Sequence, residues 1–179
     1  RLQAGDLVSL KSRRGSLIVP VSSDDSVRPG QAFLPMHWGD RFLKGGVNVL
    51  TQPAFDPLSK QPELKHTGVR IEAVTLPWQL FALVEGDVQA HLEALRPLCE
   101  NFAYASLSLA GRERPALLIR AASTQAPDNQ LLTQIDQLLG LNEGPVLSYD
   151  DPRRSIGKRV RIENGRITAI RLAGETIAQ

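Results

Sequence analysis

The pattern of apolar and polar positions differs between the two halves of the chain. In the first half, apolar runs rich in Leu, Ile and Val occupy residues 7–11, 16–21 and 31–36, and polar turns separate them. Such runs are typical of β-strands. Residues 67–74 alternate between apolar and polar positions, which predicts a further strand. Several short strands without a long helix predict a small β-barrel.

The second half, which begins near residue 76, alternates between predicted strands and helices. Strands are expected over residues 79–84, 102–110, 115–121, 160–163 and 166–172, and helices over residues 88–100 and 129–139. Asp87 and Asp128 precede the two helices and are favourable N-caps. Pro97 falls within the first helix and is expected to disturb its end. Asn164-Gly165 suits the tight turn of a hairpin. This half therefore predicts an α+β extension.

Composition and charge exclude several classes of protein. The chain has 179 residues, of which 42% are hydrophobic and 22% charged, as in a soluble globular protein. Its 21 Lys and Arg against 19 Asp and Glu give no basic excess, so we expect no nucleic-acid partner. No apolar run approaches the roughly 20 residues that cross a membrane. The single cysteine, Cys99, excludes an internal disulfide and favours an intracellular location. The chain begins with Arg1 and shows no signal peptide, which predicts a piece of a longer protein.

Residues 33–73 contain most of the unusual residues of the chain. Two of the three His, one of the two Trp, the only Met and the only Gly-Gly pair lie there. Residues 37–65 are predicted to form a long loop with apolar anchors. Long loops inside compact domains are usually functional or disordered, and the apolar anchors argue against disorder. We therefore expect a ligand site in this stretch.

Motifs in and before this stretch resemble, in the same order, the C-terminal domain of the molybdopterin oxidoreductases. They are Gly5-Asp6-Leu7-Val8, Arg13-Arg14-Gly15, Arg28-Pro29-Gly30, Pro35-Met36-His37-Trp38-Gly39, Asn48-Val49-Leu50-Thr51 and the segment from Asp56 to Lys65. Within this superfamily the chain is most similar to the large subunit of assimilatory nitrate reductases. The resemblance implies a double-psi β-barrel over residues 1–75. This barrel would bind the bis(molybdopterin guanine dinucleotide) molybdenum cofactor together with upstream domains of the same polypeptide.

A second resemblance concerns residues 76–179. Tyr149-Asp150-Asp151-Pro152-Arg153-Arg154 and Asn164-Gly165-Arg166 resemble the segment that precedes the terminal iron–sulfur domain of assimilatory nitrate reductases. The resemblance implies a cytoplasmic parent enzyme that reduces nitrate to nitrite. That parent would carry an iron–sulfur cluster outside this chain and accept electrons from a flavoprotein or ferredoxin. The chain itself has no His, Cys and carboxylate pattern with metal-ligand spacing, so it is expected to hold the cofactor and to catalyse nothing alone.

The expected site residues lie in the long loop or directly next to it, and most are polar, aromatic or glycine. The expected cofactor-binding residues are Met36, His37, Trp38, Gly46, Asn48, Thr51, Lys60, Lys65 and His66. The amide of Asn48 offers both donor and acceptor to a heterocycle. Gly46, with its neighbour Gly45, lets the backbone approach a ligand. Thr51 and the two lysines suit a pyrophosphate. The resemblance implies that either Lys65 or His66 contacts the cofactor, and that His37 lies near the substrate channel.

Other interpretations remain open at this point. Asn48 could be a turn residue, the lysines solvated loop charges, and His66 a surface residue. His37 and Trp38 could form a packed corner with a satisfied imidazole. The parent could also be a formate dehydrogenase or another molybdopterin oxidoreductase, or the barrel could be an interaction module that binds no cofactor.

Overall fold

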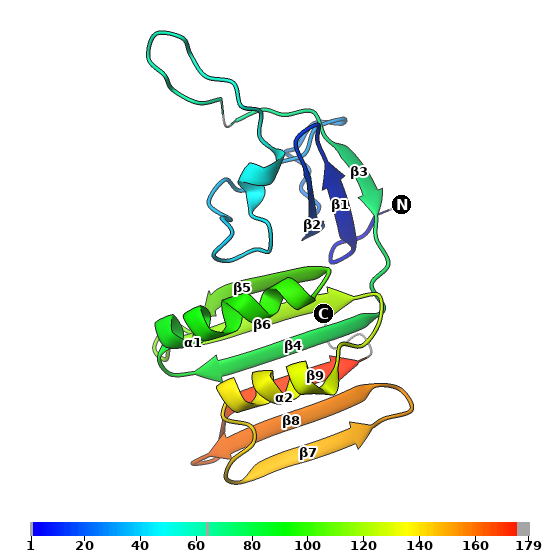
Figure 1. Cartoon of the computed structure of the whole chain (residues 1–179), viewed down its shortest axis with the longest axis vertical. Helices are drawn as coiled ribbons and strands as arrows, with labels where there is room; N and C mark the ends of the chain where they lie inside the picture. The colour runs from blue at the N-terminus through cyan, green and yellow to red at the C-terminus, as the bar shows by residue number, and fades with distance from the viewer. Residues whose placement is uncertain (1, 64, 175–179) are drawn as a thin grey trace. The chain divides into compact units, whose positions relative to one another are not determined.

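The computed structural model of the chain describes residues 2–63 and 65–174. The chain divides into two compact units, Arg1–Thr75 and Leu76–Gln179, which are described separately below (Figure 1). Both units contain antiparallel sheets, and α-helices occur only in the second unit among the described residues. The predicted fold class, mainly β with an α+β extension, is confirmed.

The first unit contains a three-stranded antiparallel sheet in the order β2-β1-β3. The strands are β1 (Leu7–Lys11), β2 (Ser16–Pro20) and β3 (Arg70–Ala73). In the central strand Val8 lies opposite Val19, and Leu10 lies opposite Leu17. All four side chains are buried, so cross-strand packing holds the β1–β2 hairpin together. The predicted strands at 7–11, 16–21 and 67–74 are confirmed, the last in its central part.

The predicted strand at residues 31–36 is wrong. The structure has no strand there, and Phe33 is 78% exposed. Turns flank the segment, with hydrogen bonds from the Gln31 amide to the Arg28 carbonyl and from the Trp38 amide to the Pro35 carbonyl. An apolar run forms a strand only where a neighbouring strand accepts its hydrogen bonds and buries it. The three described strands of this unit form an open sheet, so the double-psi barrel remains a prediction.

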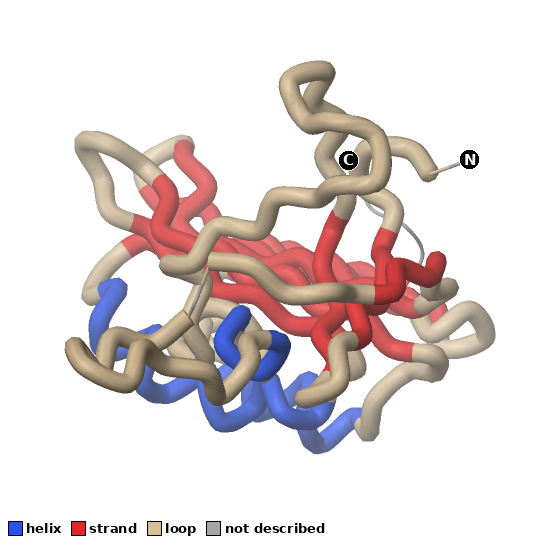
Figure 2. The backbone as a smooth tube through the Cα atoms, turned by 90° about the horizontal axis from the view of Figure 1, so that it is seen from above, coloured by secondary structure: helices blue, strands red, loops and turns tan. Residues whose placement is uncertain are grey.

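The second unit is a six-stranded antiparallel sheet in the order β5-β6-β4-β9-β8-β7. The strands are β4 (Trp78–Glu85), β5 (Tyr104–Ala110), β6 (Ala116–Ser123), β7 (Val146–Asp151), β8 (Ile156–Glu163) and β9 (Arg166–Gly174). The helices are α1 (Val88–Leu95), the 3₁₀ helix η2 (Arg96–Asn101) and α2 (Asn129–Leu138). Figure 2 shows the helices on one face of this sheet. Burial alternates along β4, where Leu80, Ala82 and Val84 belong to the core.

The helix ends follow the capping residues. The Asp87 carboxylate accepts a hydrogen bond from the Ala90 amide, and the Asp128 carboxylate accepts one from the Gln130 amide, each at 3.0 Å. The single helix predicted over 88–100 is wrong beyond residue 95, where the chain continues as η2 with Pro97 in its first turn. Proline has no amide hydrogen to continue an α-helix. After α2, Gly140 adopts a φ of 64° and ends the helix.

The hairpin of β8 and β9 turns at Asn164 and Gly165, whose φ angles of 52° and 75° are those of the predicted tight turn. β8 begins four residues earlier than predicted. β7 was not predicted at all. It is an edge strand whose burial pattern runs mostly exposed. A strand without a buried face has little apolar alternation to reveal it.

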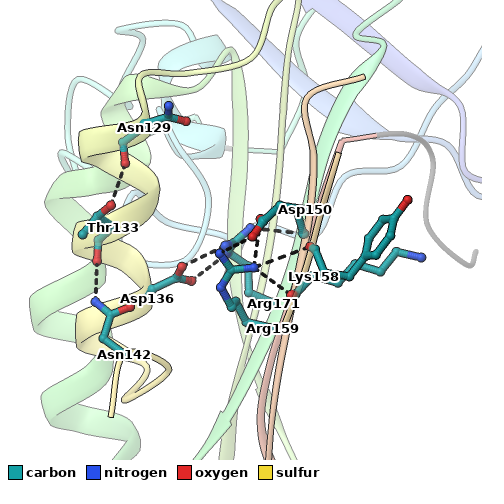
Figure 3. Close-up of polar contacts among 10 residues, drawn as sticks. Asn129, Thr133, Asp136, Asn142, Asp150, Lys158, Arg159 and Arg171 are labelled. Carbon is teal, nitrogen blue, oxygen red and sulfur yellow. Dashed lines mark hydrogen bonds and ion pairs between the residues drawn. The ribbon is translucent and has the colours of Figure 1, made fainter. Parts of the chain in front are cut away.

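Charged residues occupy the helix-covered face near α2 (Figure 3). Asp136 of α2 and Arg171 of β9 are both buried and form a two-fold contact, Nε to Oδ1 at 2.5 Å and Nη2 to Oδ2 at 2.8 Å. Arg171 Nη1 also donates to the Gly157 carbonyl at 3.2 Å. Arg159 and Asp150 form a similar but more exposed pair. Each of these charges has its partner within the unit, so the cluster is structural.

Candidate functional site

The candidate site is built around a short 3₁₀ helix, η1 (Val47–Leu50), in the long loop of the first unit. Gly46 precedes it with a φ of 61° and a ψ of 155°. A Cβ atom on Gly46 would lie 2.5 Å from the backbone nitrogen of Asp40. Gly46 therefore lets the chain at Asp40 approach η1. This contact is with backbone, and an approach to a ligand at Gly46 stays a prediction.

Asn48 lies on the exposed side of η1, whereas Val47 and Leu50 are buried beneath it. The Asn48 carbonyl accepts hydrogen bonds from the Thr51 hydroxyl at 2.9 Å and from the Thr51 amide at 3.2 Å. Within the described residues the Asn48 side-chain amide forms no hydrogen bond. The helix thus holds the backbone of Asn48 in place and leaves its side chain available to a ligand.

The segment with Met36, His37 and Trp38 is joined to η1 through its backbone. The Trp38 carbonyl accepts a hydrogen bond from the Val47 amide at 2.9 Å. All three side chains are exposed, Met36 by 47% and Trp38 by 41%. The alternative of a packed corner with a satisfied imidazole is therefore wrong. An exposed indole on a segment that is bonded to η1 is suited to packing against a flat heterocycle.

Residues 51–63, 65 and 66 form an arm that extends away from the three strands (Figure 1). Phe55 and Pro62 pair as an isolated β-bridge across the arm. At the base, the Thr67 hydroxyl donates to the Leu50 carbonyl at 3.2 Å, which ties the end of the arm to η1. The long loop is thus held by its own hydrogen bonds.

The tip of the arm is organised by Asp56. Its carboxylate accepts hydrogen bonds from the Ser59 amide at 2.7 Å, the Ser59 hydroxyl at 3.0 Å and the Leu58 amide at 3.0 Å. These hydrogen bonds lower the pKa of Asp56, and the bond from the Ser59 amide has the largest effect. Lys60 follows with a φ of 60°, and its Nζ lies 5.4 Å from the centroid of the Phe55 ring. Lys60 therefore lies at the tip, beyond the bridge, and not beside Asn48.

The returning side of the arm is organised by Glu63. Its carboxylate accepts hydrogen bonds from the Lys65 amide at 2.8 Å and the His66 amide at 3.2 Å. The hydrogen bond from the Lys65 amide lowers the pKa of Glu63. Lys65 and His66 are exposed and immediately precede Thr67, which is bonded to η1. The structure thus places these two candidates at the base of the arm and separates them from Lys60.

Sequence reasoning missed the two carboxylates. Asp56 and Glu63 were absent from the expected site, although they fix the backbone that carries the candidate cations. The signal was available for Asp56, since an Asp three residues before a Ser is a common turn motif. Glu63 offered no such local signal.

The exposed side chains around η1 form a donor and acceptor set without a metal site. These groups are the amide of Asn48, the hydroxyl of Thr51, the ammonium group of Lys65, the imidazole of His66 and the indole of Trp38. Their types match a heterocycle linked to a diphosphate. No group of three or more His, Cys, Asp or Glu suited to a metal ion occurs in residues 2–63 and 65–174.

Comparison with known families agrees with this chemistry. Residues 1–68 match the family described as the molydopterin dinucleotide binding domain. The matched region of the dinucleotide binding domain includes β1, β2, η1 and the whole arm.

Named relatives are oxidoreductases of two kinds. A nitrate reductase of Klebsiella oxytoca is 36% identical over 63% of this chain, and a nitrate reductase of Synechocystis is 48% identical over 36% of it. The alpha subunit of an F420-dependent formate dehydrogenase of Methanocaldococcus jannaschii is 38% identical over 41% of it. The chain spans only 13%, 9% and 10% of these relatives, respectively. No solved structure matches the chain.

Proposed function

We propose that the first unit binds the guanine dinucleotide form of the molybdopterin cofactor, together with upstream domains of the same polypeptide. The observation that supports this most is the free amide of Asn48 on η1, in a stretch that matches the model of a dinucleotide binding domain. Lys65 supplies positive charge at the base of the arm, where its amide and that of His66 are bonded to Glu63. In this proposal Trp38 packs against the heterocycle and Lys65 binds the diphosphate. Thr51 contributes to the diphosphate only after its hydroxyl leaves the Asn48 carbonyl. Lys60, at the tip of the arm, would contact a more distant phosphate group or another domain of the parent protein.

We further propose that the parent protein reduces nitrate to nitrite. The match to the Klebsiella nitrate reductase covers 63% of the 179 residues, which is more than the 75 residues of the first unit. It therefore extends into the second unit. The match to the formate dehydrogenase covers 41% of the chain, no more than the length of the first unit. Formate oxidation remains the second candidate because of that relative.

The remaining proposals concern the parent. It would carry an iron–sulfur cluster, accept electrons from a flavoprotein or ferredoxin and work in the cytoplasm, without a nucleic-acid or membrane partner. Their support is the similarity of residues 149–154 to the segment before an iron–sulfur domain. Among the described residues, no helix has the length and apolar character needed to cross a membrane.

The test is to assay the full-length protein, purified from a host that makes the cofactor, for two reactions. With reduced viologen dye as electron donor, nitrite formation from nitrate supports the nitrate proposal. Formate oxidation with an artificial acceptor, in the absence of nitrite formation, would replace it by the second candidate. Molybdenum in the protein with neither activity would reject both substrates and keep the cofactor proposal.

A further inference from the structure

The β1–β2 turn presents two arginines in a fixed conformation. The Ser12 hydroxyl oxygen accepts a hydrogen bond from the Arg14 amide at 3.0 Å. The Ser12 amide donates to the Gly15 carbonyl at 2.9 Å and closes the turn. Arg13 and Arg14 therefore project from a backbone that is already ordered, so binding through them costs little backbone entropy.

This turn packs directly on η1. A Cβ atom on Gly15 would lie 2.7 Å from Cγ2 of Val49 and 3.0 Å from its carbonyl oxygen, so only glycine allows the approach. Val49 is the neighbour of Asn48 on the same short helix. The turn and η1 meet at one end of the sheet (Figure 1). The two arginines thus lie one or two residues from a point of contact with the helix that carries the free amide.

At this end of the sheet some basic residues form ion pairs and others, among the described residues, do not. Glu72 lies 2.9 Å from Lys11 Nζ and 3.0 Å from Arg70 Nη2. The hydrogen bond from Lys11 is the main cause that lowers the pKa of Glu72, and the charges of Arg70 and Lys11 lower it further. In the described part of the chain, Arg13 and Arg14 are exposed and have no carboxylate partner. Two neighbouring guanidinium groups therefore remain available to an external anion.

We propose that the Arg13-Arg14 turn binds the diphosphate of the dinucleotide whose heterocycle contacts Asn48. This inference rests on the proposed function and adds residues that the sequence did not single out as ligands. A guanidinium group can donate two parallel hydrogen bonds to one phosphate, and two such groups match a diphosphate. The arginines fill this role better than Lys60, which lies over Phe55 at the tip of the arm.

The test compares GDP with guanosine as probes of the 179-residue chain, by calorimetric titration at low and moderate salt. In Arg13→Gln/Arg14→Gln, GDP binding should weaken about tenfold or more, since two charge-assisted contacts are lost. Its salt dependence should also fall, while guanosine binding stays unchanged. Arg13→Lys/Arg14→Lys should restore part of the affinity. Arg112→Gln is the matched control, because Arg112 is an exposed arginine in the β5–β6 turn of the other unit.

The outcomes separate this inference from the proposed function. Equal loss of GDP affinity in the turn variant and in Arg112→Gln would reveal nonspecific charge binding and overturn the inference. GDP affinity that falls in Asn48→Ala but not in the turn variant would overturn the inference and leave the proposed function intact. Absence of GDP binding by the unaltered chain would also overturn it. The pterin content of the full-length protein would then decide the proposed function separately.

Discussion

At the scale of the residue, carboxylates and small residues set the geometry that the candidate ligands use. Asp56 and Glu63 accept backbone hydrogen bonds and thereby orient the two parts of the arm. Gly15 and Gly46 let neighbouring segments approach η1 more closely than a side chain would allow. None of these four residues offers a donor for a cofactor. Their contribution is to place Asn48, Lys65 and the arginine turn.

Glu63 gives a prediction about pH. Its pKa is lowered because its charged form accepts the Lys65 amide, so the turn at Lys65 and His66 is formed at neutral pH. It should be lost as the pH falls through that lowered pKa. In NMR titration, the amide signals of Lys65 and His66 should shift together, with a midpoint below the usual range of a glutamate. Glu63→Gln should abolish this shift. A midpoint within the usual range would contradict the proposed role of the carboxylate.

At the scale of the element, local chemistry predicted more than hydrophobicity did. The caps at Asp87 and Asp128 and the Asn164-Gly165 turn could be read directly, because each acts on the few residues next to it. The apolar run at 31–36 failed because strand formation depends on a partner strand that the sequence does not identify. η1 could not be predicted either. It has only four residues, and its formation depends on the burial of Val47 and Leu50 and on the backbone conformation of Gly46.

The buried pair of Asp136 and Arg171 holds α2 to the sheet and gives a prediction about stability. Asp136→Ala leaves Arg171, a residue that is only 2% exposed, without its carboxylate partner, which should cost about 3–5 kcal/mol of unfolding free energy. Asp150→Ala, which breaks the more exposed pair with Arg159, should cost about 1 kcal/mol or less. Denaturant unfolding followed by circular dichroism measures both.

A second variant separates the pair's charge from its packing. Asp136→Leu with Arg171→Met removes both charges and keeps apolar volume, so it should be closer in stability to the unaltered chain than Asp136→Ala. Similar losses in Asp136→Ala and Asp150→Ala would show that the buried pair has no special role in attaching α2.

At the scale of the whole molecule, the two units contribute differently to the functional proposal. The first unit carries the free amide, the arm and the arginine turn, and its first 68 residues match the model of a dinucleotide binding domain. Every site residue predicted from the sequence lies in this unit. The second unit contains the internally paired charge cluster, and the extent of the Klebsiella match into it supports the nitrate proposal. The resemblance to the family predicted the cofactor class, whereas the position of each ligand needed the fold.

The most direct measurement is the pterin, guanine nucleotide and molybdenum content of the purified full-length protein and two variants. Asn48→Ala removes the free amide, and Asn129→Ala removes another exposed amide, from α2, as a control. We expect all three components in the unaltered protein and in the control. Asn48→Ala should lower them by up to about tenfold, the effect of one or two lost hydrogen bonds. Equal content in Asn48→Ala, or no pterin in any of the three proteins, would contradict the central claim.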